Sequence, residues 1–325
     1  MNGAPEVFVI GAGIVDVLVS GVDSGVFERG STPAGGISMQ TGGDGLNEAM
    51  ILSMLGRSAG LVSCIGSDDA GGVVLEACRR AGVDARFVAR HDGTPTGVNI
   101  VLIDDAGERR FITDPNGSLR KLPPEDVLAA IDDPAFAGAK IAAFASIFVC
   151  PLLTPVLEAI FSRIRERGLI LCADMTKHKN GETVEDIRGA LSHVDYIFPN
   201  HEEAVLVTGE TEPERIARRF MDCGVKNVAI KLGGRGCYIA NDRIGRIIPA
   251  VPGIRAVDTT GAGDNFAAGF MAALCENMDF EDCARYANAV ASLCVENIGA
   301  SSGSRDRTEI MRRMEMIRRA EANDR

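Results

Sequence analysis

The sequence has few basic residues for its length. Lysine and arginine number 34 among 325 residues, against 45 aspartates and glutamates, so the formal charge is −11 and the pI is near 5.0. Proteins whose main role is to bind nucleic acid carry an excess of positive charge. A dominant nucleic-acid-binding function is therefore disfavoured, and any phosphate group must be held locally.

Long apolar segments and paired cysteines are also missing. The longest run without a charge, residues 141–157, is shorter than the roughly 20 apolar residues of a membrane span and contains Pro151 and Pro155. The nine cysteines are scattered and form no CxxC pair, which favours reduced thiols in the core. The N-terminus lacks a basic segment and runs directly into a strand-like stretch, unlike a secretory signal. We expect a cytoplasmic protein with no membrane partner.

Three common catalytic signatures are absent. No Gly-Lys dipeptide occurs, which excludes a GxxxxGK[ST] phosphate loop. The segment GAGIVD at 11–16 begins like a dinucleotide-binding fingerprint, but Asp16 stands where the third glycine belongs, so a dehydrogenase is disfavoured. There is no HExxH motif, and the four histidines are too dispersed to define a metal site or a catalytic triad.

Short β-branched or aromatic runs alternate with segments of helical length. Hydrophobic residues make up 46% of the chain, which is too many for a disordered protein. The alternation predicts βαβ units, and so an α/β fold with a doubly wound, mainly parallel sheet and helices on both faces. The predicted strands cover residues 7–10, 60–66, 140–146, 169–174, 196–200 and 227–233, and the predicted helices 47–55, 72–81, 155–167, 212–223 and 265–276.

Two segments interrupt this alternation, at about 15–40 and 95–113. Each shows strand-like alternation and turn residues without a helix of useful length. Within the second, Val98–Ile103 and Arg109–Thr113 flank a polar turn in which Gly107 can supply a positive φ, which indicates a hairpin. We predict that both segments form a small β-sheet lid on a single domain spanning 1–325, which the helical segment 305–325 closes.

The stretch AVDTTGAGDNFAAGF, residues 256–270, is the most informative for chemistry. A turn with Gly261 and Gly263 opens a helix of small and apolar residues. Backbone amides of Gly261, Ala262, Gly263 and Asp264 would be unpaired at the helix N-terminus, where the helix dipole also favours an anion. The alternative is a simple helix cap in which Asp264 satisfies amides.

Several stretches together resemble the ribokinase-like, or PfkB, carbohydrate kinases. DTTGAGDNFAAGF is similar to the C-terminal motif of that family, and TGGDGLNEAMILSMLG at 41–56 to its N-terminal glycine-rich motif. PNHEEA at 199–204 resembles the NxxE motif of the family. KLGGRG at 231–236 and the segment 287–300 resemble its adenine-side loop and closing helix. The resemblances occur in family order, from Val9 to about Gly303.

The resemblance implies a reaction and a set of catalytic residues. Asp264 would act as general base on a primary sugar hydroxyl that attacks the γ-phosphate of ATP, and amides of Gly261, Ala262 and Gly263 would form an anion hole. Asn200 and Glu203 would organise Mg²⁺ and its waters near the phosphates. The alternative for Asn200 and Glu203 is a helix cap after a strand.

The resemblance also implies binding residues for both substrates. Asp16 could instead cap a turn, and an apolar lid residue could simply belong to the core. The positions implied for the sugar are Asp16, Gly42, Gly43, Asn47, Val98 and Ile100, and those implied for ATP are Asn200, Glu203, Lys231, Gly233, Gly236 and Asn288.

Some relatives bind a monovalent cation beside the anion hole. Asp258, the carbonyl of Thr260 and the 294–303 loop occupy the corresponding positions, so activation by K⁺ is a hypothesis. The loop 174–182 is polar and basic and could touch phosphate, although a solvated loop is an equal alternative.

The substrate is left open between two kinds of acceptor. The segment at 14–16 departs from the Asn-Ala-Asp pattern of typical ribokinases, which puts ribose in doubt and leaves a fructokinase-like sugar kinase or a nucleoside kinase. A non-catalytic sensor is the alternative from another class, against which the intact Asp264 argues. The exposed edge of the lid could also pair two copies into a homodimer.

Overall fold

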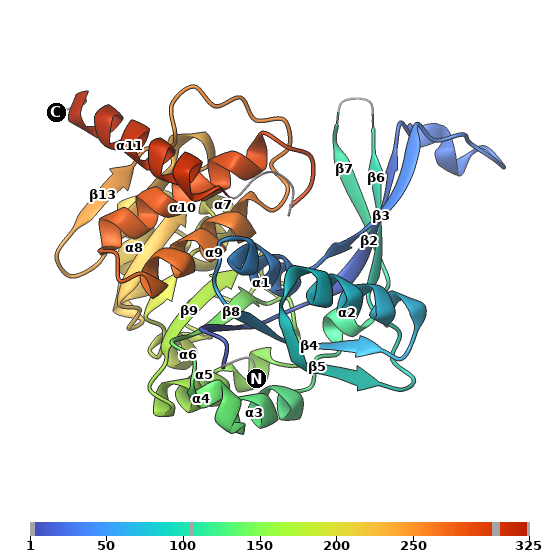
Figure 1. Ribbon diagram of the computed structural model, residues 1–325, viewed down its shortest axis with the longest axis horizontal. Coiled ribbons are helices and arrows are strands. Elements are labelled where there is room, and N and C mark those ends of the chain that lie inside the picture. Colours follow the sequence, from blue (N-terminus) through green and yellow to red (C-terminus); the bar gives the residue numbers. More distant parts are fainter. Residues whose placement is uncertain (1–3, 105–106, 301–305, 324–325) are drawn as a thin grey trace.

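A computed structural model describes residues 4–104, 107–300 and 306–323. Its main sheet has nine strands in the order β13-β12-β11-β10-β9-β8-β1-β4-β5 (Figure 1). All neighbouring pairs are parallel except β11 with β12 and β12 with β13. The strands are β1 Val7–Ile10, β4 Ala59–Gly66, β5 Asp84–His91, β8 Ile141–Ile147, β9 Ile170–Met175, β10 Tyr196–Ile197, β11 Asn227–Lys231, β12 Cys237–Ala240 and β13 Gly245–Ile248.

Helices cover both faces of this sheet, because its central strands are apolar on both sides. In β1, Val7 and Val9 belong to one core and Phe8 and Ile10 to the other, as expected for a parallel strand buried on two faces. The first core is shared with α1 Asp44–Met54, α2 Asp69–Ala81, α9 Ala262–Cys275, α10 Phe280–Val295 and α11 Arg307–Asn323. The second is shared with α3 Pro124–Asp132, α4 Pro134–Ala137, α5 Leu157–Glu166, α6 Arg188–Leu191, α7 His201–Thr208 and α8 Pro213–Asp222.

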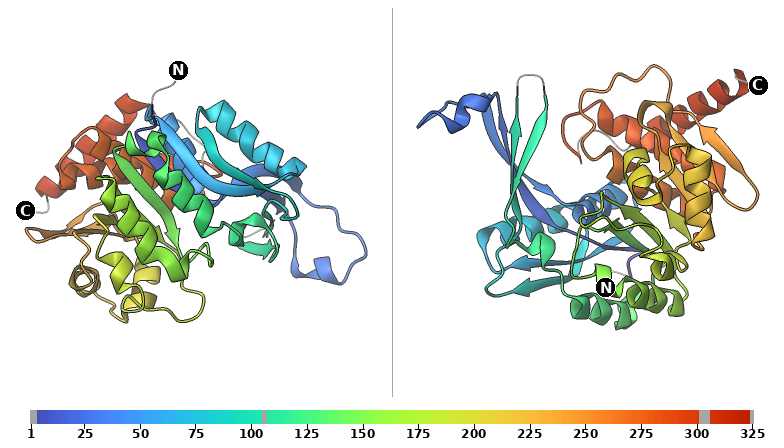
Figure 2. Two further views of the ribbon diagram at one scale, coloured as in Figure 1. Left: turned by 90° about the horizontal axis from the view of Figure 1, so that it is seen from below. Right: turned by 180° about the vertical axis from the view of Figure 1, so that it is seen from behind.

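A second, four-stranded sheet projects from the main body, as Figures 1 and 2 show, and confirms the small sheet predicted from sequence. Gly107, in the turn of the predicted hairpin, has a φ of +82°. The strand order is β3-β2-β6-β7, with β2 Ile14–Ser20, β3 Gly36–Gly42, β6 Val98–Ile103 and β7 Arg109–Thr113.

Two neighbouring rows of paired residues across the small sheet differ in chemistry. One row across the strands is apolar and another is polar, and because neighbouring residues of a strand alternate, the two rows lie on opposite faces. The apolar row is Met39, Val17, Ile100 and Ile112, and the polar row is Gln40, Asp16, Asn99 and Thr113.

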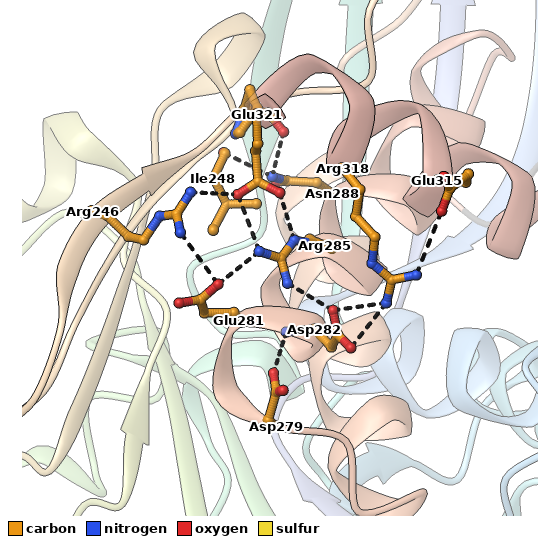
Figure 3. Close-up of polar contacts among 11 residues, drawn as sticks. Arg246, Ile248, Asp279, Glu281, Asp282, Arg285, Asn288, Glu315, Arg318 and Glu321 are labelled. Atoms are coloured by element: carbon orange, nitrogen blue, oxygen red, sulfur yellow. Dashed lines mark hydrogen bonds and ion pairs between the residues drawn. The ribbon is translucent and has the colours of Figure 1, made fainter. Parts of the chain in front are cut away.

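An ion-pair network fastens α11 to α10 and β13 (Figure 3). Arg285 of α10 donates to Glu321 of α11 at 2.7 Å and to Asp282 at 2.7 Å. Glu321 also accepts from Arg246 of β13 at 2.7 Å, and Arg318 of α11 donates to both carboxylate oxygens of Asp282 at 2.9 Å. The helix predicted at the C-terminal end is thus held against the helix that follows α9.

Two expectations about the core and the membrane can be compared with the structure. All nine cysteines are buried and lie outside any disulfide in the described part of the chain. Among the residues that the structure describes, no helix is both long enough and apolar enough to cross a membrane.

Candidate functional site

A cavity of about 610 Å³ opens where several parallel strands end. The carboxyl ends of β8, β9 and β11 reach it, together with the N-termini of α7 and α9, which is the usual position of a ligand site in an open α/β sheet. Its lining includes ten of the residues discussed below, namely Asp44, Asp174, Asn200, Glu203, Lys231, Gly233, Gly236, Gly263, Asp264 and Asn288.

The N-terminus of α9 forms one wall of this cavity. Gly261 precedes the helix with a φ of +71°, and a Cβ atom there would lie 2.2 Å from the Cβ of Ala300. The Asn265 side chain donates to the carbonyls of Gly261 at 2.8 Å and Ala300 at 2.7 Å, which fixes the turn. The amide of Ala262 donates to the carbonyl of Thr259 at 3.2 Å, so the prediction that this amide is unpaired is wrong.

Asp264 lies in the first turn of α9 and faces the cavity. Its Oδ2 accepts a hydrogen bond from Asn47 Nδ2 at 2.7 Å, which links α9 to α1. Burial raises the pKa of Asp264, whereas the Asn47 hydrogen bond and the charge of Lys231 oppose that rise. Burial and the nearby charge of Asp264 also raise the pKa of Asp44 to about 6.

Lys231, at the end of β11, is paired with Asp174 at the end of β9. The distance between Lys231 Nζ and Asp174 Oδ2 is 2.5 Å. Burial alone would lower the pKa of Lys231, but the charges of Asp174 and Glu203 raise it, so the ammonium is the favoured form. Burial raises the pKa of Asp174 to about 7. Asp174 was predicted at the end of a strand and the start of a polar loop, but it was not named as a site residue.

The loop after Asp174 divides between the cavity and the surface. Met175 and Thr176 line the cavity. Further along, Lys177 pairs with Glu202 at 3.1 Å on the exterior. The start of the loop 174–182 therefore lies at the cavity and Lys177 at the surface, and contact of the loop with phosphate stays a prediction.

Asn200 and Glu203 form a capping box at the start of α7. Asn200 Oδ1 accepts from the Glu203 amide at 2.9 Å, and the Asn200 amide donates to Glu203 Oε2 at 3.0 Å. Both residues also line the cavity, so the cap and the site occur together. Burial raises the pKa of Glu203, and Lys231 opposes that rise.

Glycines shape the cavity wall after β11. Gly236 has a φ of +93°, and a Cβ atom there would lie 2.1 Å from the carbonyl oxygen of Ile248. Gly233 has a φ of +60°. Asn288 of α10 donates to the carbonyls of Ile248 and Pro249, at 3.1 Å each, so its amide nitrogen holds the strand that packs behind this loop.

The residues predicted for the sugar gather beside α1. A Cβ atom on Gly42 would lie 2.1 Å from Asp16 Oδ2, so any residue other than glycine at position 42 would clash with this carboxylate. Gly43 has a φ of +91° and caps α1. Burial raises the pKa of Asp16, and Asn99 opposes this by donating to Asp16 Oδ1 at 3.0 Å.

Val98 and Ile100 lie on the opposite face of the small sheet from Asp16, and their contact with the substrate stays a prediction. In the β2–β6 ladder Asp16 is paired with Asn99, and alternation turns both neighbours of Asn99 away. Asn99 was missed from the sequence. Its Oδ1 is buried and has no hydrogen-bond partner among the described residues.

Comparisons with known proteins agree with this arrangement. The family described as pfkB family carbohydrate kinase matches residues 4–307. The chain belongs to this family. An uncharacterized sugar kinase of Archaeoglobus fulgidus is 31% identical over 257 residues, which cover 78% of this chain and 98% of that protein. A ribokinase of Haemophilus influenzae is 28% identical over 288 residues, which cover 84% and 87% of the two chains.

Solved structures of ribokinases share the fold of this pfkB-family kinase. Ribokinase of Arabidopsis thaliana, complexed with ribose and ATP, aligns with a TM-score of 0.80 and 26% identity, covering 96% of this chain and 99% of that one. Ribokinase of Thermotoga maritima aligns with a TM-score of 0.80 and 25% identity, with the same coverage. The predicted fold and the predicted class, a phosphotransferase acting on a sugar hydroxyl, are confirmed.

The carboxylate of Asp258 in this kinase is already occupied by protein donors. Its Oδ1 accepts from the amide and the hydroxyl of Thr260, at 3.0 and 2.7 Å. Its Oδ2 accepts from the amide of Gly299 at 2.9 Å and from Arg109 Nη2 at 2.6 Å. A guanidinium beside this carboxylate does not fit a K⁺ ion in the same place. Residues 301–303 of the predicted cation loop lie outside the described residues.

Proposed function

We propose that this kinase transfers the γ-phosphoryl group of ATP to a primary hydroxyl of a small neutral sugar. The observation that carries the proposal is the position of Asp264. Its carboxylate lies at the N-terminus of α9, is bound by Asn47 at 2.7 Å, and lines the same cavity as Lys231 and the glycine loop. The same cavity thus contains a base, a helix N-terminus that can bind an anion, and a glycine loop that can bind a nucleotide.

Asp264 acts as the general base that accepts the proton of the sugar hydroxyl. A base of this kind contributes about 10² to 10⁴ in rate. Burial raises its pKa, which makes the carboxylate a stronger base than an exposed one, and Asn47 keeps its Oδ2 oriented. Asn47 is therefore a positioning residue for the base.

The phosphoryl group is stabilised by backbone amides at the N-terminus of α9 and by the ammonium group of Lys231. The amides of Gly263 and Asp264 precede the first backbone hydrogen bond of α9, which runs from Asn265 to Gly261. Such amides meet charge that develops on the equatorial oxygens during transfer. Lys231 adds a buried ammonium on the same side of the cavity.

Magnesium fits the acidic side of the cavity. Glu203 and Asp174 present carboxylate oxygens there, and Mg²⁺ in such enzymes is held by one or two carboxylates together with waters and phosphates. Among the described residues no group of three or more metal-binding side chains forms a closed cage, in keeping with an ion that arrives with the nucleotide. Bound Mg²⁺ neutralises phosphate charge during transfer.

The nucleotide is proposed to lie along the glycine loop after β11. Gly233 and Gly236, both with positive φ, let a ligand approach the backbone closely. Asn288 acts indirectly, since its amide holds the carbonyls of Ile248 and Pro249. A relative 26% identical in sequence has been solved with ribose and ATP, which supports ATP as the nucleotide.

The sugar is proposed to lie between α1 and the face of the small sheet that carries Asp16 and Asn99, and this sheet serves as a lid. Asp16 and Asn47 supply oxygen and amide groups for hydroxyls, and Asn99 orients Asp16. The acids Asp16, Asp44 and Asp264 surround this end, whereas Lys231 and Arg109 are each paired with an acid. Like charges repel an anionic acceptor, which favours a neutral sugar over a sugar acid or a sugar phosphate.

We also propose that two copies pair through the apolar face of the lid. On this face Ile37 is 72%, Met39 61%, Ile112 48% and Ile100 40% exposed. Three of these side chains belong to the apolar row across the four strands. A contiguous apolar patch of this kind on a projecting sheet favours burial against a second copy.

The proposal is tested by measuring ADP release with Mg²⁺ and ATP across a panel of acceptors. We expect a strong response to one neutral sugar such as ribose or fructose, and weak responses to 2-keto-3-deoxygluconate and ribose 1-phosphate. A stronger response to adenosine would show that the acceptor is a nucleoside and not a sugar. Silence across the panel with ATP binding retained would favour the non-catalytic sensor.

The sugar end is tested with lid variants. Asn99→Ala removes a hydrogen bond to a charged group, so we expect the KM of the sugar to rise about 10-fold while the KM of ATP is unchanged. Ile100→Ala, one residue along on the opposite face, is the matched control and should leave the sugar KM unchanged. Equal effects of the two substitutions would contradict the proposed site.

A further inference from the structure

One ion pair joins the lid to the loop that leads into α9. Arg109 Nη2 of β7 lies 2.6 Å from Asp258 Oδ2, although the two residues are 149 positions apart. Both side chains are largely removed from solvent, at 17% and 10% exposure. Arg109 lies on the same face of the lid as Asn99 and Asp16, which is the face turned toward the main body.

Asp258 in turn holds the turn that precedes the anion-binding helix. Its carboxylate binds the amide and hydroxyl of Thr260 and the amide of Gly299. The backbone amides of Val257 and Asp258 donate to the carbonyl of Val295, at 2.7 and 3.2 Å, which fastens the same segment to the end of α10. An interaction that fixes the Asp258 side chain therefore also fixes the turn at 258–261, which leads into α9.

Arg109 is the positive charge that this carboxylate faces. Burial alone would raise the pKa of Asp258, but the amides of Thr260 and Gly299, the Thr260 hydroxyl and the charge of Arg109 lower it. The carboxylate is thus ionised, and Arg109 supplies a charge-assisted hydrogen bond to it. No site remains on this carboxylate for a free cation that would do the same.

We infer that Arg109 is a positioning residue that closes the lid onto the 258–261 turn and acts there as a built-in cation. The inference rests on the proposed kinase function. Closing the lid and ordering the anion-binding turn become one event, because the Asp258 carboxylate binds both Arg109 of the lid and the backbone amides of Thr260 and Gly299. The kinase should then work equally well without a small monovalent cation.

The first experiment compares the wild-type protein in KCl and in tetramethylammonium chloride of equal ionic strength. We expect the same kcat and KM, within about 2-fold, and the same Tm in both salts. A wild-type kcat that requires K⁺ would overturn the inference while leaving the kinase function intact. No ADP release with any acceptor would instead count against the proposed function, and the Tm comparison would still test the inference.

The second experiment removes the built-in charge. Loss of a hydrogen bond between charged groups is worth about 1.5–3 kcal/mol, so kcat/KM of Arg109→Ala should fall about 10- to 100-fold in tetramethylammonium chloride. In KCl, we expect part of the lost activity to return and the Tm of Arg109→Ala to rise. The substitution removes the guanidinium from Asp258 Oδ2, and K⁺ can then bind the carboxylate at that position. Arg109→Lys keeps a charge and should remain insensitive to the salt.

Arg110→Ala is the matched control, since Arg110 is exposed and points to the other face of the same strand. It should keep wild-type kcat/KM in both salts. Equal losses in Arg109→Ala and Arg110→Ala would refute the inference. So would an Arg109→Ala variant whose Tm and kcat/KM do not distinguish K⁺ from tetramethylammonium.

Discussion

At the scale of residues, the site crowds carboxyl groups around a single lysine. Lys231 interacts with Asp174, Glu203 and Asp264. Glu48 of α1 is 1% exposed, has an Oε1 without a hydrogen-bond partner in the described part of the chain, and has a pKa raised well above the usual value by burial and by its acidic neighbours. Several of these carboxyls therefore take up protons at higher pH than exposed ones do.

The pH dependence of kcat should follow the acids nearest the transferred proton. Asp264 works ionised, and its pKa is raised, so activity should rise as pH rises through the titration of this group. The charge of Asp264 raises the pKa of Asp44, and because repulsion between two like charges is mutual, an ionised Asp44 also opposes ionisation of Asp264. In Asp44→Asn the midpoint of the acid limb of kcat against pH should move to lower pH.

Asp69→Asn is the control for this shift, because Asp69 occupies the first turn of α2 as Asp44 does that of α1 but is exposed. Its pH profile should match that of the wild-type protein. An acid limb that stays in place, or moves to higher pH, in Asp44→Asn would contradict the electrostatic coupling of Asp44 to the base.

The sequence predicted the positions of backbone-determined residues better than those of side chains. Gly42 and Gly261 were identified from glycine-rich motifs in the local sequence, and the structure gives the physical reason, since a Cβ atom at either position would lie 2.1 to 2.2 Å from a neighbouring atom. On β6 the sequence pointed to Val98 and Ile100, whereas the residue that binds Asp16 is Asn99 between them, and neighbouring residues of a strand lie on opposite faces. The partner of Asp258 is 149 residues away, and no local pattern carries that information.

At the scale of elements, the turn before α9 is the most constrained part of the site. Gly261→Ala would place a Cβ 2.2 Å from Ala300 Cβ at a φ of +71°, so the turn must move and carry the amides of α9 with it. Losing one well-placed donor to a developing anion costs about 10²- to 10³-fold in kcat. We expect a loss of that size in the ADP-release assay.

Gly253→Ala is the control that separates the effect of backbone strain from the effect of displacing the amides of α9. Gly253 has a φ of +78° but nothing within 4 Å of a Cβ atom, and it lies on the exposed loop after β13. This variant should cost about 1 kcal/mol of stability from backbone strain and leave kcat unchanged. A Gly261→Ala enzyme as active as Gly253→Ala would show that the turn is not part of the anion site.

Element boundaries were predictable where the chain itself sets them. Strand β1 matches its prediction, 7–10, because four consecutive apolar residues can only be buried on both faces. The strand predicted at 196–200 ends at Ile197, since Pro199 cannot donate to the ladder. The antiparallel pair β12 and β13 escaped prediction because its partner strands are chosen by tertiary packing rather than by local pattern.

At the scale of the whole molecule, a lid projects from the main body (Figure 1), and one face of this lid carries the apolar row Met39, Val17, Ile100 and Ile112. If the apolar face pairs two copies, the protein should elute as a dimer in size-exclusion chromatography with light scattering. Met39→Glu places a charge on that face, at a side chain that is 61% exposed, and should give a monomer. Ile247→Glu, at an equally apolar position of β13 that is 47% exposed, is the control and should remain dimeric.

A wild-type protein that is monomeric at all accessible concentrations would contradict pairing through the lid. So would a Met39→Glu variant that stays dimeric. Neither outcome would affect the assignment of Asp264 or of the cavity, because every residue placed at those sites comes from one chain.

The most direct test of the account is the turnover of Asp264→Asn with the best acceptor of the panel. The substitution keeps the shape of the side chain but removes the base, so kcat should fall about 10²- to 10⁴-fold while the Kd of ATP, measured by calorimetry, stays within a few-fold of wild type. Turnover near the wild-type rate would contradict Asp264 as the base and, with it, the proposed mechanism.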